Sequence, residues 1–229
     1  MSAVEPAGPA REPLLRAPDE EAEDEAFLRR YGPWAPLDPA GVAAFMAGFG
    51  RPWWIVGGWA IEAFTGLPRE HEDVDVSILV RDVPGLREHV GERWHLWSNA
   101  GGTLRPLDEQ FPDVLDPEGQ VWVREHAQAP WVIDLPLTPD RDGRWTNKRL
   151  PGHVAPLEEV TWVATDGIRY LRPEIVLHFK ARLGRPKDDR DLARTLPLLD
   201  AGQRAWLRDA VRRTEPGHRW LEVLGAARP

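Results

Sequence analysis

The sequence predicts an α/β (α+β) fold: a domain on a mixed sheet over residues 38–172, followed by a C-terminal helical domain over residues 173–229. Between residues 38 and 172, short runs of β-branched and aromatic residues alternate with segments in which apolar residues recur at helical spacing. From Pro173 onward only the helical spacing remains. Residues 1–25 are rich in Pro, Ala and Glu and show little apolar periodicity, so we predict a disordered acidic leader there.

The first elements of the sheet domain follow from capping residues and glycines. Asp38 can cap a helix at 39–49, where apolar side chains recur every three or four residues. An aromatic and β-branched run at 53–56 predicts a buried strand, after which Gly57 and Gly58 turn the chain. The next elements are a helix at 59–64 with Gly66 as its C-cap, a strand at 74–80 and a helix at 84–90.

The rest of the chain divides into strands and then helices. Three strands are expected at 94–97, 121–124 and 131–137, and the Pro, Asp and Gly content of residues 105–120 indicates a loop. An Asp-Gly pair at 166–167 between two strand-like runs, 161–164 and 168–171, predicts a hairpin. The C-terminal part is predicted to form four helices, at 173–183, 187–196, 201–213 and 217–224.

Composition limits the classes of protein to consider. The 229 residues include 42% hydrophobic residues and 12 Trp, which indicate one sizeable globular core, and no apolar run is long enough for a membrane span. The N-terminus lacks the basic and apolar regions of a secretory signal, so we expect a cytoplasmic location. Because there is no Cys, a thiolate nucleophile is excluded and any metal must be held by carboxylates or His.

The charge balance argues against nucleic-acid substrates. A net charge of −8 and a pI near 5.4 work against binding of polyanions, so neither DNA nor RNA is an expected partner. An acidic surface instead favours a cationic small molecule, although part of the acidic excess lies in the leader. Only three of the 29 basic residues are lysines, Lys148, Lys180 and Lys187, and a compact ammonium group suits a phosphate oxygen.

A pair of aspartates begins the predicted strand at 74–80. Polar and apolar residues alternate over residues 72–76 (EDVDV), which puts Asp73 and Asp75 on one face of the strand, about 6 to 7 Å apart along it. Both carboxylates could reach one hard cation. Taken alone, the pattern favours a solvated edge strand, because Asp-x-Asp is short and common.

The context upstream favours a phosphate site. A diglycine at a strand-to-helix turn, Gly57-Gly58, lets phosphate oxygens approach the backbone and the free N–H groups of a helix N-terminus. Neither the Gly-x-Gly-x-x-Gly nor the Gly-Lys-Ser/Thr motif is present, so the dinucleotide-binding and P-loop motifs are missing. The alternative is a tight turn without a ligand.

A third carboxylate, Asp134, interrupts the apolar run at 131–135 (WVIDL). A carboxylate in a core strand is unfavourable unless it is paired or bound to a metal. Phosphoryl transfer with two metal ions needs such a group near the attacking hydroxyl. The alternative is an ion pair with one of the many arginines.

These motifs together resemble the nucleotidyltransferases of the DNA polymerase β-like superfamily, and most closely the aminoglycoside and lincosamide adenylyltransferases. The resemblance rests on residues 56–62 (VGGWAIE) and 69–75 (REHEDVD), and extends to the downstream segments 145–149, 173–180 and 185–191. The sequence departs from the family pattern at Glu62, where the family often has Asp.

The resemblance implies a nucleotidyltransferase fold, an enzyme and a set of site residues. It implies Mg²⁺, two ions in the usual mechanism, on Asp73 and Asp75, with Asp134 as third metal ligand or base, and ATP or another nucleoside triphosphate as co-substrate. The residues expected to contact the nucleotide are Gly57, Gly58, Arg69 and Lys180, with Lys187 less supported because it opens a charged helix face that local ion pairs would explain.

The resemblance further implies transfer of a nucleoside monophosphate to a hydroxyl of a small molecule such as an aminoglycoside, and thus a role in antibiotic resistance. Trp97 or Trp145 could stack on a sugar or a base. Two alternatives share the fold: an enzyme of the toxin or antitoxin type that modifies protein or tRNA, and a non-catalytic nucleotide-binding protein.

Overall fold

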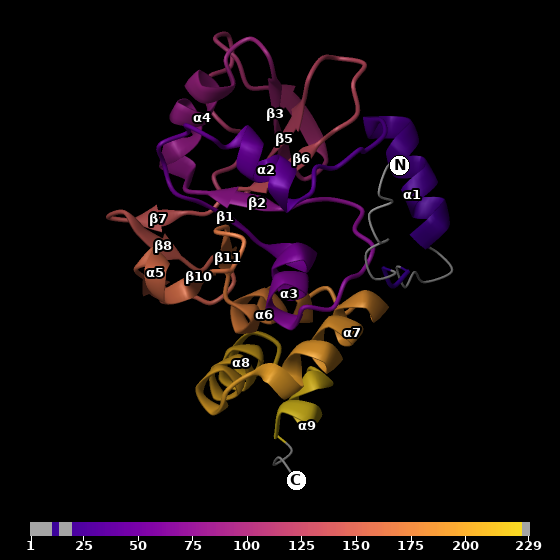
Figure 1. Ribbon diagram of the computed structural model, residues 1–229, viewed down its shortest axis with the longest axis vertical. Coiled ribbons are helices and arrows are strands. Elements are labelled where there is room, and N and C mark those ends of the chain that lie inside the picture. Colours follow the sequence, from indigo (N-terminus) through magenta and orange to yellow (C-terminus); the bar gives the residue numbers. More distant parts are fainter. Residues whose placement is uncertain (1–10, 14–19, 226–229) are drawn as a thin grey trace, which may run out of the picture.

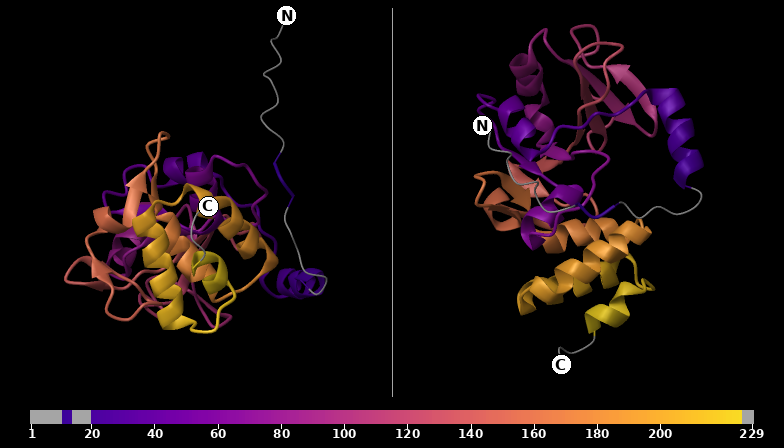
Figure 2. Two further views of the ribbon diagram at one scale, coloured as in Figure 1. Left: turned by 90° about the horizontal axis from the view of Figure 1, so that it is seen from below. Right: turned by 45° about the vertical axis from the view of Figure 1, so that its right-hand side comes forward.

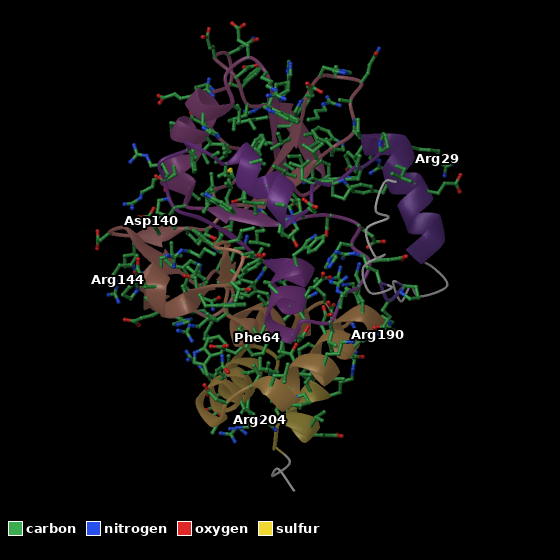
Figure 3. The ribbon with its side chains drawn as sticks, viewed as in Figure 1. Arg29, Phe64, Asp140, Arg144, Arg190 and Arg204 are labelled. Atoms are coloured by element: carbon green, nitrogen blue, oxygen red, sulfur yellow. The ribbon has the colours of Figure 1, made fainter. Side chains whose placement is uncertain are left out.

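The computed structural model describes residues 11–13 and 20–225. Most of the predicted leader, residues 1–10 and 14–19, lies outside the described residues. Where the leader is described, the prediction of disorder is wrong: residues 20–25 form the first part of helix α1 (Glu20–Tyr31). Glu12 lies against the segment Pro68–Glu70 and makes an ion pair of 2.8 Å with Arg190 (Figure 3).

Two four-stranded sheets form the centre of the larger part of the molecule. Their strand orders are β10-β11-β1-β2 and β4-β3-β5-β6, and a small third sheet has the order β7-β8-β9. The strands are β1 (Trp53–Ile55), β2 (Val76–Ile78), β3 (His95–Ala100), β4 (Thr103–Pro106), β5 (Gln120–Arg124), β6 (Ile133–Pro136), β7 (Asp140–Arg141), β8 (Arg144–Thr146), β9 (Val154–Ala155), β10 (Thr161–Val163) and β11 (Arg169–Leu171).

Strands β2 and β6 join the two larger sheets. Parallel bridges pair Asp75 with Asp134 and Leu79 with Thr138, one at each end of the two strands. Strand β1 is parallel to β11 and antiparallel to β2, and the β3, β5 and β6 pairs are antiparallel. The predicted mixed sheet is therefore confirmed, and its junction lies where two of the predicted site carboxylates meet.

Helices cover the sheets and extend the molecule downward in Figure 1. The two helices α6 and α7 contact α3, and α8 and α9 pack beyond α6, so that the C-terminal helices lie together below the sheets (Figures 1 and 2). The helices after α1 are α2 (Pro39–Phe45), α3 (Gly57–Thr65), α4 (Val83–Val90), α5 (Leu157–Val160), α6 (Pro173–Ala181), α7 (Pro186–Thr195), α8 (Ala201–Thr214) and α9 (Trp220–Gly225), with 3-10 turns η1 (Val80–Asp82) and η2 (Leu196–Leu198).

The local signals in the sequence have identifiable structural counterparts. Asp38 caps α2 by accepting a hydrogen bond of 2.7 Å from the Gly41 N–H, and Gly66 ends α3 in the left-handed region. Helix α2 ends at Phe45, four residues earlier than predicted, because the chain turns toward Gly48, which has a φ of 84°. In the part of the chain that the structure describes, no helix combines the length and the apolar character that crossing a bilayer requires.

A buried histidine ties two C-terminal helices together. His178 of α6 is 3% exposed and shares a hydrogen bond of 3.1 Å with the Thr214 hydroxyl of α8. Burial, with smaller effects of His153 and Arg149, lowers the pKa of His178 from 6.5 to about 4. The His178 ring is therefore neutral between the packed helices at neutral pH.

This histidine predicts acid sensitivity of the fold. The pKa of His178 is lower in the folded than in the unfolded chain. The free energy of unfolding is therefore unaffected by this residue above pH 6.5 and decreases as the pH falls toward 4, because the unfolded chain binds the proton more tightly. Between pH 7 and 4.5 the wild type is expected to lose about 2 to 3 kcal/mol of unfolding free energy that His178→Gln does not lose. Urea unfolding at the two pH values measures this difference, with the exposed His126→Gln as control. Equal losses in wild type and His178→Gln would contradict it.

Candidate active site

Two of the three predicted carboxylates, Asp75 and Asp134, meet at the junction of β2 and β6, and Asp73 lies two residues before Asp75. Asp73 and Asp75 directly precede β2, and Asp134 is the second residue of β6. Asp75 and Asp134 face each other in the parallel bridge, and the Asp134 N–H donates a hydrogen bond of 3.1 Å to the Val74 carbonyl. Neighbouring strands lie about 4.8 Å apart, so these two carboxylates belong to one site.

The carboxylates raise one another's proton affinity. Burial first, and then the charge of Asp73, raise the pKa of Asp75 to about 7, while Lys180, Arg185 and Lys187 act in the opposite direction. The pKa of Asp134 is raised well above its usual value by burial and then by Asp75 and Asp73. Burial and mutual repulsion thus both disfavour the charged carboxylates, and a bound divalent cation would relieve both effects.

Asp134 keeps one oxygen unsatisfied. Its Oδ2 accepts a hydrogen bond of 2.8 Å from the Gln120 amide, whereas its Oδ1 is buried and has no hydrogen-bond partner. Three hard oxygen donors with an unsatisfied buried oxygen among them fit Mg²⁺ in their chemistry. Within residues 11–13 and 20–225, however, no three acidic or histidine side chains stand close enough to hold a metal ion by themselves. Any ion bound here would need further ligands from a substrate.

The N-terminus of α3 adjoins the carboxylates. The Val56 N–H donates a hydrogen bond of 2.9 Å to the Asp75 carbonyl, and α3 begins at the next residue, Gly57, so that the diglycine is part of the helix and not a turn before it. Gly57 has a φ of 62°, and a β-carbon there would lie 1.9 Å from Asp75 Oδ2. Glycine is thus required at position 57 by both the backbone and the carboxylate.

Gly57→Ala is expected to disturb the site directly. The left-handed backbone should cost about 1 to 2 kcal/mol of unfolding free energy, and displacement of the Asp75 carboxylate should lower kcat/KM by at least about a hundredfold. Gly66→Ala is the matched control, because Gly66 has a φ of 68° but nothing within 4 Å of an added β-carbon. The two variants should lose similar stability in urea unfolding, and only Gly57→Ala should lose activity. Equal activity of the two variants would contradict this assignment.

Gly58 makes room for Arg69 and His71. A β-carbon at Gly58 would lie 1.8 Å from Arg69 Nη2 and 3.1 Å from His71 Nδ1. Trp59 stacks on the His71 ring at 3.9 Å, and His71 Nε2 shares a hydrogen bond of 2.8 Å with Glu62. Burial tends to raise the pKa of Glu62, but the His71 hydrogen bond and the Arg69 N–H lower it overall. Glu62 therefore holds the loop that carries Arg69 and His71 onto α3.

Lys180 lies in a buried ion-pair cluster. Its ammonium group is 3.0 Å from Asp188 and 2.9 Å from Asp191, and Asp191 also lies 3.5 Å from Arg69 Nε. Its charge is therefore largely balanced by protein carboxylates. Lys187 makes its ion pair of 2.8 Å with Glu72, three residues before Asp75, and not with neighbours on its own helix as the sequence suggested.

Two residues near the site escaped the sequence analysis. Arg185 contacts Asp188 at 2.9 Å, and this pair together with the charges of Asp73 and Asp75 raises the pKa of the guanidinium. Gln120, which holds Asp134, lies at the end of a segment predicted to be a loop. For Gln120 the only signal is its place one residue before a strand; for Arg185 the position before Pro186 at a helix start was visible but not distinctive.

The two tryptophans that the sequence suggested for stacking on a substrate differ in their burial. Trp145 is 1% exposed and belongs to the core, so it cannot stack on a substrate. Trp97 is partly buried in contact with Trp131, and the Arg124 guanidinium lies over its ring at 4.6 Å. The interpretation of Trp145 as a stacking residue was wrong because β8 turns its side chain inward.

Comparison with known proteins confirms the resemblance and the fold. Residues 40–90, which include Gly57, Gly58, Arg69, Asp73 and Asp75, match the family model for aminoglycoside-2''-adenylyltransferase. No curated protein matches the chain. With this family match and the shared fold described next, the prediction of a nucleotidyltransferase enzyme resembling the aminoglycoside and lincosamide adenylyltransferases is confirmed.

Solved structures are similar to this chain at low sequence identity, and the first of them has the same fold. The crystal structure of ANT(2'')-Ia in complex with adenylyl-2''-tobramycin is 17% identical, with a TM-score of 0.51 over 75% of this chain and 93% of that one. A solution structure of ANT(2'')-Ia is 19% identical, with a TM-score of 0.49 over 76% and 89%. Lincomycin-bound LnuA, a lincosamide antibiotic adenylyltransferase, is 14% identical, with a TM-score of 0.47 over 70% and 97%.

Proposed function

We propose that this chain is a Mg²⁺-dependent adenylyltransferase that transfers AMP from ATP to a hydroxyl group of a small antibiotic-like molecule. The observation that carries the proposal is the meeting of Asp75 with Asp134 in adjacent parallel strands, beside the glycine-led N-terminus of α3. This arrangement combines concentrated negative charge with free backbone N–H groups. A metal-bound triphosphate needs both features.

Each part of the site has a proposed role. Asp73 and Asp75 would hold Mg²⁺, which when bound would supply charge neutralisation for the triphosphate. Because the described residues do not by themselves enclose an ion, the triphosphate oxygens would complete the coordination, as is common for this cation. The N–H groups of Gly57 and Gly58 would contact phosphate oxygens.

Asp134 is the proposed base. Its Oδ1 is buried without a partner, and the raised pKa of its carboxyl suits a group that accepts a proton. The acceptor hydroxyl would attack the α-phosphorus as its proton passes to Asp134. The bond from the α-phosphorus to the bridging oxygen would break, and pyrophosphate would leave.

The basic side chains near the site would act on the phosphates of the nucleotide at different distances. Arg69, which packs on Gly58, would lie nearest to the phosphates at α3. Because Lys180 is paired with Asp188 and Asp191, it would act on the phosphates only through its electrostatic potential, and it would hold α7 in place. Lys187 would contact a phosphate only if its ion pair with Glu72 broke. Arg185 is more accessible, with 37% of its side chain exposed, and is a further candidate for the leaving pyrophosphate.

The class of acceptor is proposed from charge and from the similar structures. The chain carries a net charge of −8, which favours a cationic acceptor. The structures with this fold were determined with adenylyl-tobramycin and with lincomycin. We therefore propose an aminoglycoside or a lincosamide as the acceptor.

Pyrophosphate release tests this proposal. The protein is incubated with Mg²⁺, ATP and a panel of aminoglycosides and lincosamides, with Asp73→Asn as the inactive control and the exposed Asp113→Asn as the matched control. Release that depends on one of the drugs, and that is lost only in Asp73→Asn, supports the proposal. Turnover only with a protein or tRNA, or ATP binding without turnover on any acceptor, would overturn it.

A further inference from the structure

The face of the sheet that carries Asp134 also carries a row of polar side chains. In the antiparallel register Asn99 of β3 is opposite Gln120 of β5, and Trp122 of β5 is opposite Asp134 of β6. Alternate residues of a strand point to the same face, so Gln120 and Trp122 share the face of Asp134. Val121, which lies between Gln120 and Trp122, points to the opposite face and is fully buried in the core.

The Gln120 amide has a defined orientation. Its Nε2 donates a hydrogen bond of 2.8 Å to Asp134 Oδ2, and its Oε1 accepts one of 3.3 Å from Asn99 Nδ2. An amide turned over would place its oxygen against the carboxylate and its NH₂ against another NH₂ group. The two successive hydrogen bonds, from Asn99 to Gln120 and from Gln120 to Asp134, therefore hold an N–H donor against one oxygen of the Asp134 carboxylate.

Trp122 restricts the carboxylate from a second side. Its side chain packs against aromatic rings of α1 and of the segment that follows α1, with ring centroids 5.3 to 5.8 Å apart. Its indole N–H is buried without a well-formed hydrogen bond, yet it lies close enough to Asp134 to favour the charged carboxylate. Trp122 is 5% exposed, so this wall is part of the packed interior.

The two oxygens of Asp134 are thereby made different. Oδ2 is occupied by Gln120, and Oδ1 is left buried and unpartnered. We propose that Gln120, backed by Asn99, is a positioning residue that fixes the orientation of the Asp134 carboxylate for its reaction with the acceptor hydroxyl. This inference rests on the proposed function, because it assigns Gln120 a role in the reaction of Asp134.

Gln120→Met tests the proposal, because methionine keeps the length of the side chain and removes the donor. Loss of such a supporting partner is expected to lower kcat by about 10- to 100-fold. The KM for ATP should change little, because Gln120 is proposed to act on Asp134 and not on the nucleotide. Asn99→Ala should show a smaller loss in the same direction. The matched control is Gln128→Met at an exposed position, which should leave kcat unchanged.

A double-variant cycle separates positioning from general weakening of the fold. If Gln120 acts through Asp134, Gln120→Met should lower kcat in the wild type but have little further effect in an Asp134→Asn background. Equal losses in both backgrounds, or a wild-type kcat in Gln120→Met that folds normally, would overturn the inference. Absence of turnover by the wild type with every acceptor would instead reject the proposed function.

Discussion

Asp75→Asn is expected to lower kcat/KM for ATP by about a thousandfold. Asp75 is the carboxylate that adjoins both Asp134 and the N-terminus of α3, so it is the best placed to hold a cation against a triphosphate. Loss of a metal ligand removes several kcal/mol of charge stabilisation from the transition state, and each 1.36 kcal/mol corresponds to about a factor of ten. Steady-state pyrophosphate release at saturating acceptor measures the effect.

The same variant should be more stable than the wild type when divalent cations are removed. At pH 8 the buried Asp75 is charged and lies close to two further acidic groups, Asp73 and Asp134, and the amide removes both the cost of burying that charge and the repulsion. A gain of about 1 kcal/mol would raise Tm by roughly 2 to 4 °C in a chain of this length. Mg²⁺ should then raise the Tm of the wild type more than that of Asp75→Asn. Loss of both activity and stability in Asp75→Asn would indicate a structural role instead.

Asp134→Asn is expected to lower kcat by about a thousandfold, within the range for loss of a general base. The substitution keeps the volume of the side chain and can keep the hydrogen bond with Gln120. The KM for ATP should change little, because Asp134 is assigned to the acceptor hydroxyl and not to the nucleotide.

Nucleotide binding provides the control for Asp134→Asn. Intrinsic fluorescence of the 12 tryptophans can follow a titration with ATP and Mg²⁺, and the variant should bind as the wild type does. A kcat within tenfold of wild type would remove Asp134 from the role of base, whereas loss of ATP binding would make it chiefly a metal ligand.

Much of the fold follows from short-range signals in the sequence. Asp38, Gly66 and the Asp-Gly pair at 166–167 mark local hydrogen bonds and backbone conformations that do not depend on distant residues. Strands β4, β7, β8 and β9 were not predicted, because they are only two to four residues long and too short to show an alternating apolar pattern, although β4 and β8 pair with the strand before them across short turns. Helix α1 was missed because its charged sequence lacks a wide apolar stripe, and Phe27 and Tyr31 become informative only once they meet Trp122.

The candidate site was accessible from the sequence to different degrees. The aspartates stand out because charged residues interrupt apolar strands, and the parallel pairing of Asp75 with Asp134 brings them together as expected. The environment of Lys180 could not be predicted, because its partners Asp188 and Asp191 lie on the next helix and face it only after α6 and α7 pack. Gln120 carried no signal beyond its place one residue before a predicted strand, because its role depends on Asp134, its neighbour on β6.

A crystal containing Mn²⁺ and a non-hydrolysable ATP analogue tests the central claim most directly, because the anomalous signal of manganese locates the metal independently of any model. The account predicts a manganese peak bound by the carboxylates of Asp73 and Asp75, with phosphate oxygens of the analogue reaching the N–H groups of Gly57 and Gly58. Nucleotide bound elsewhere, or manganese bound away from Asp73 and Asp75, would contradict it.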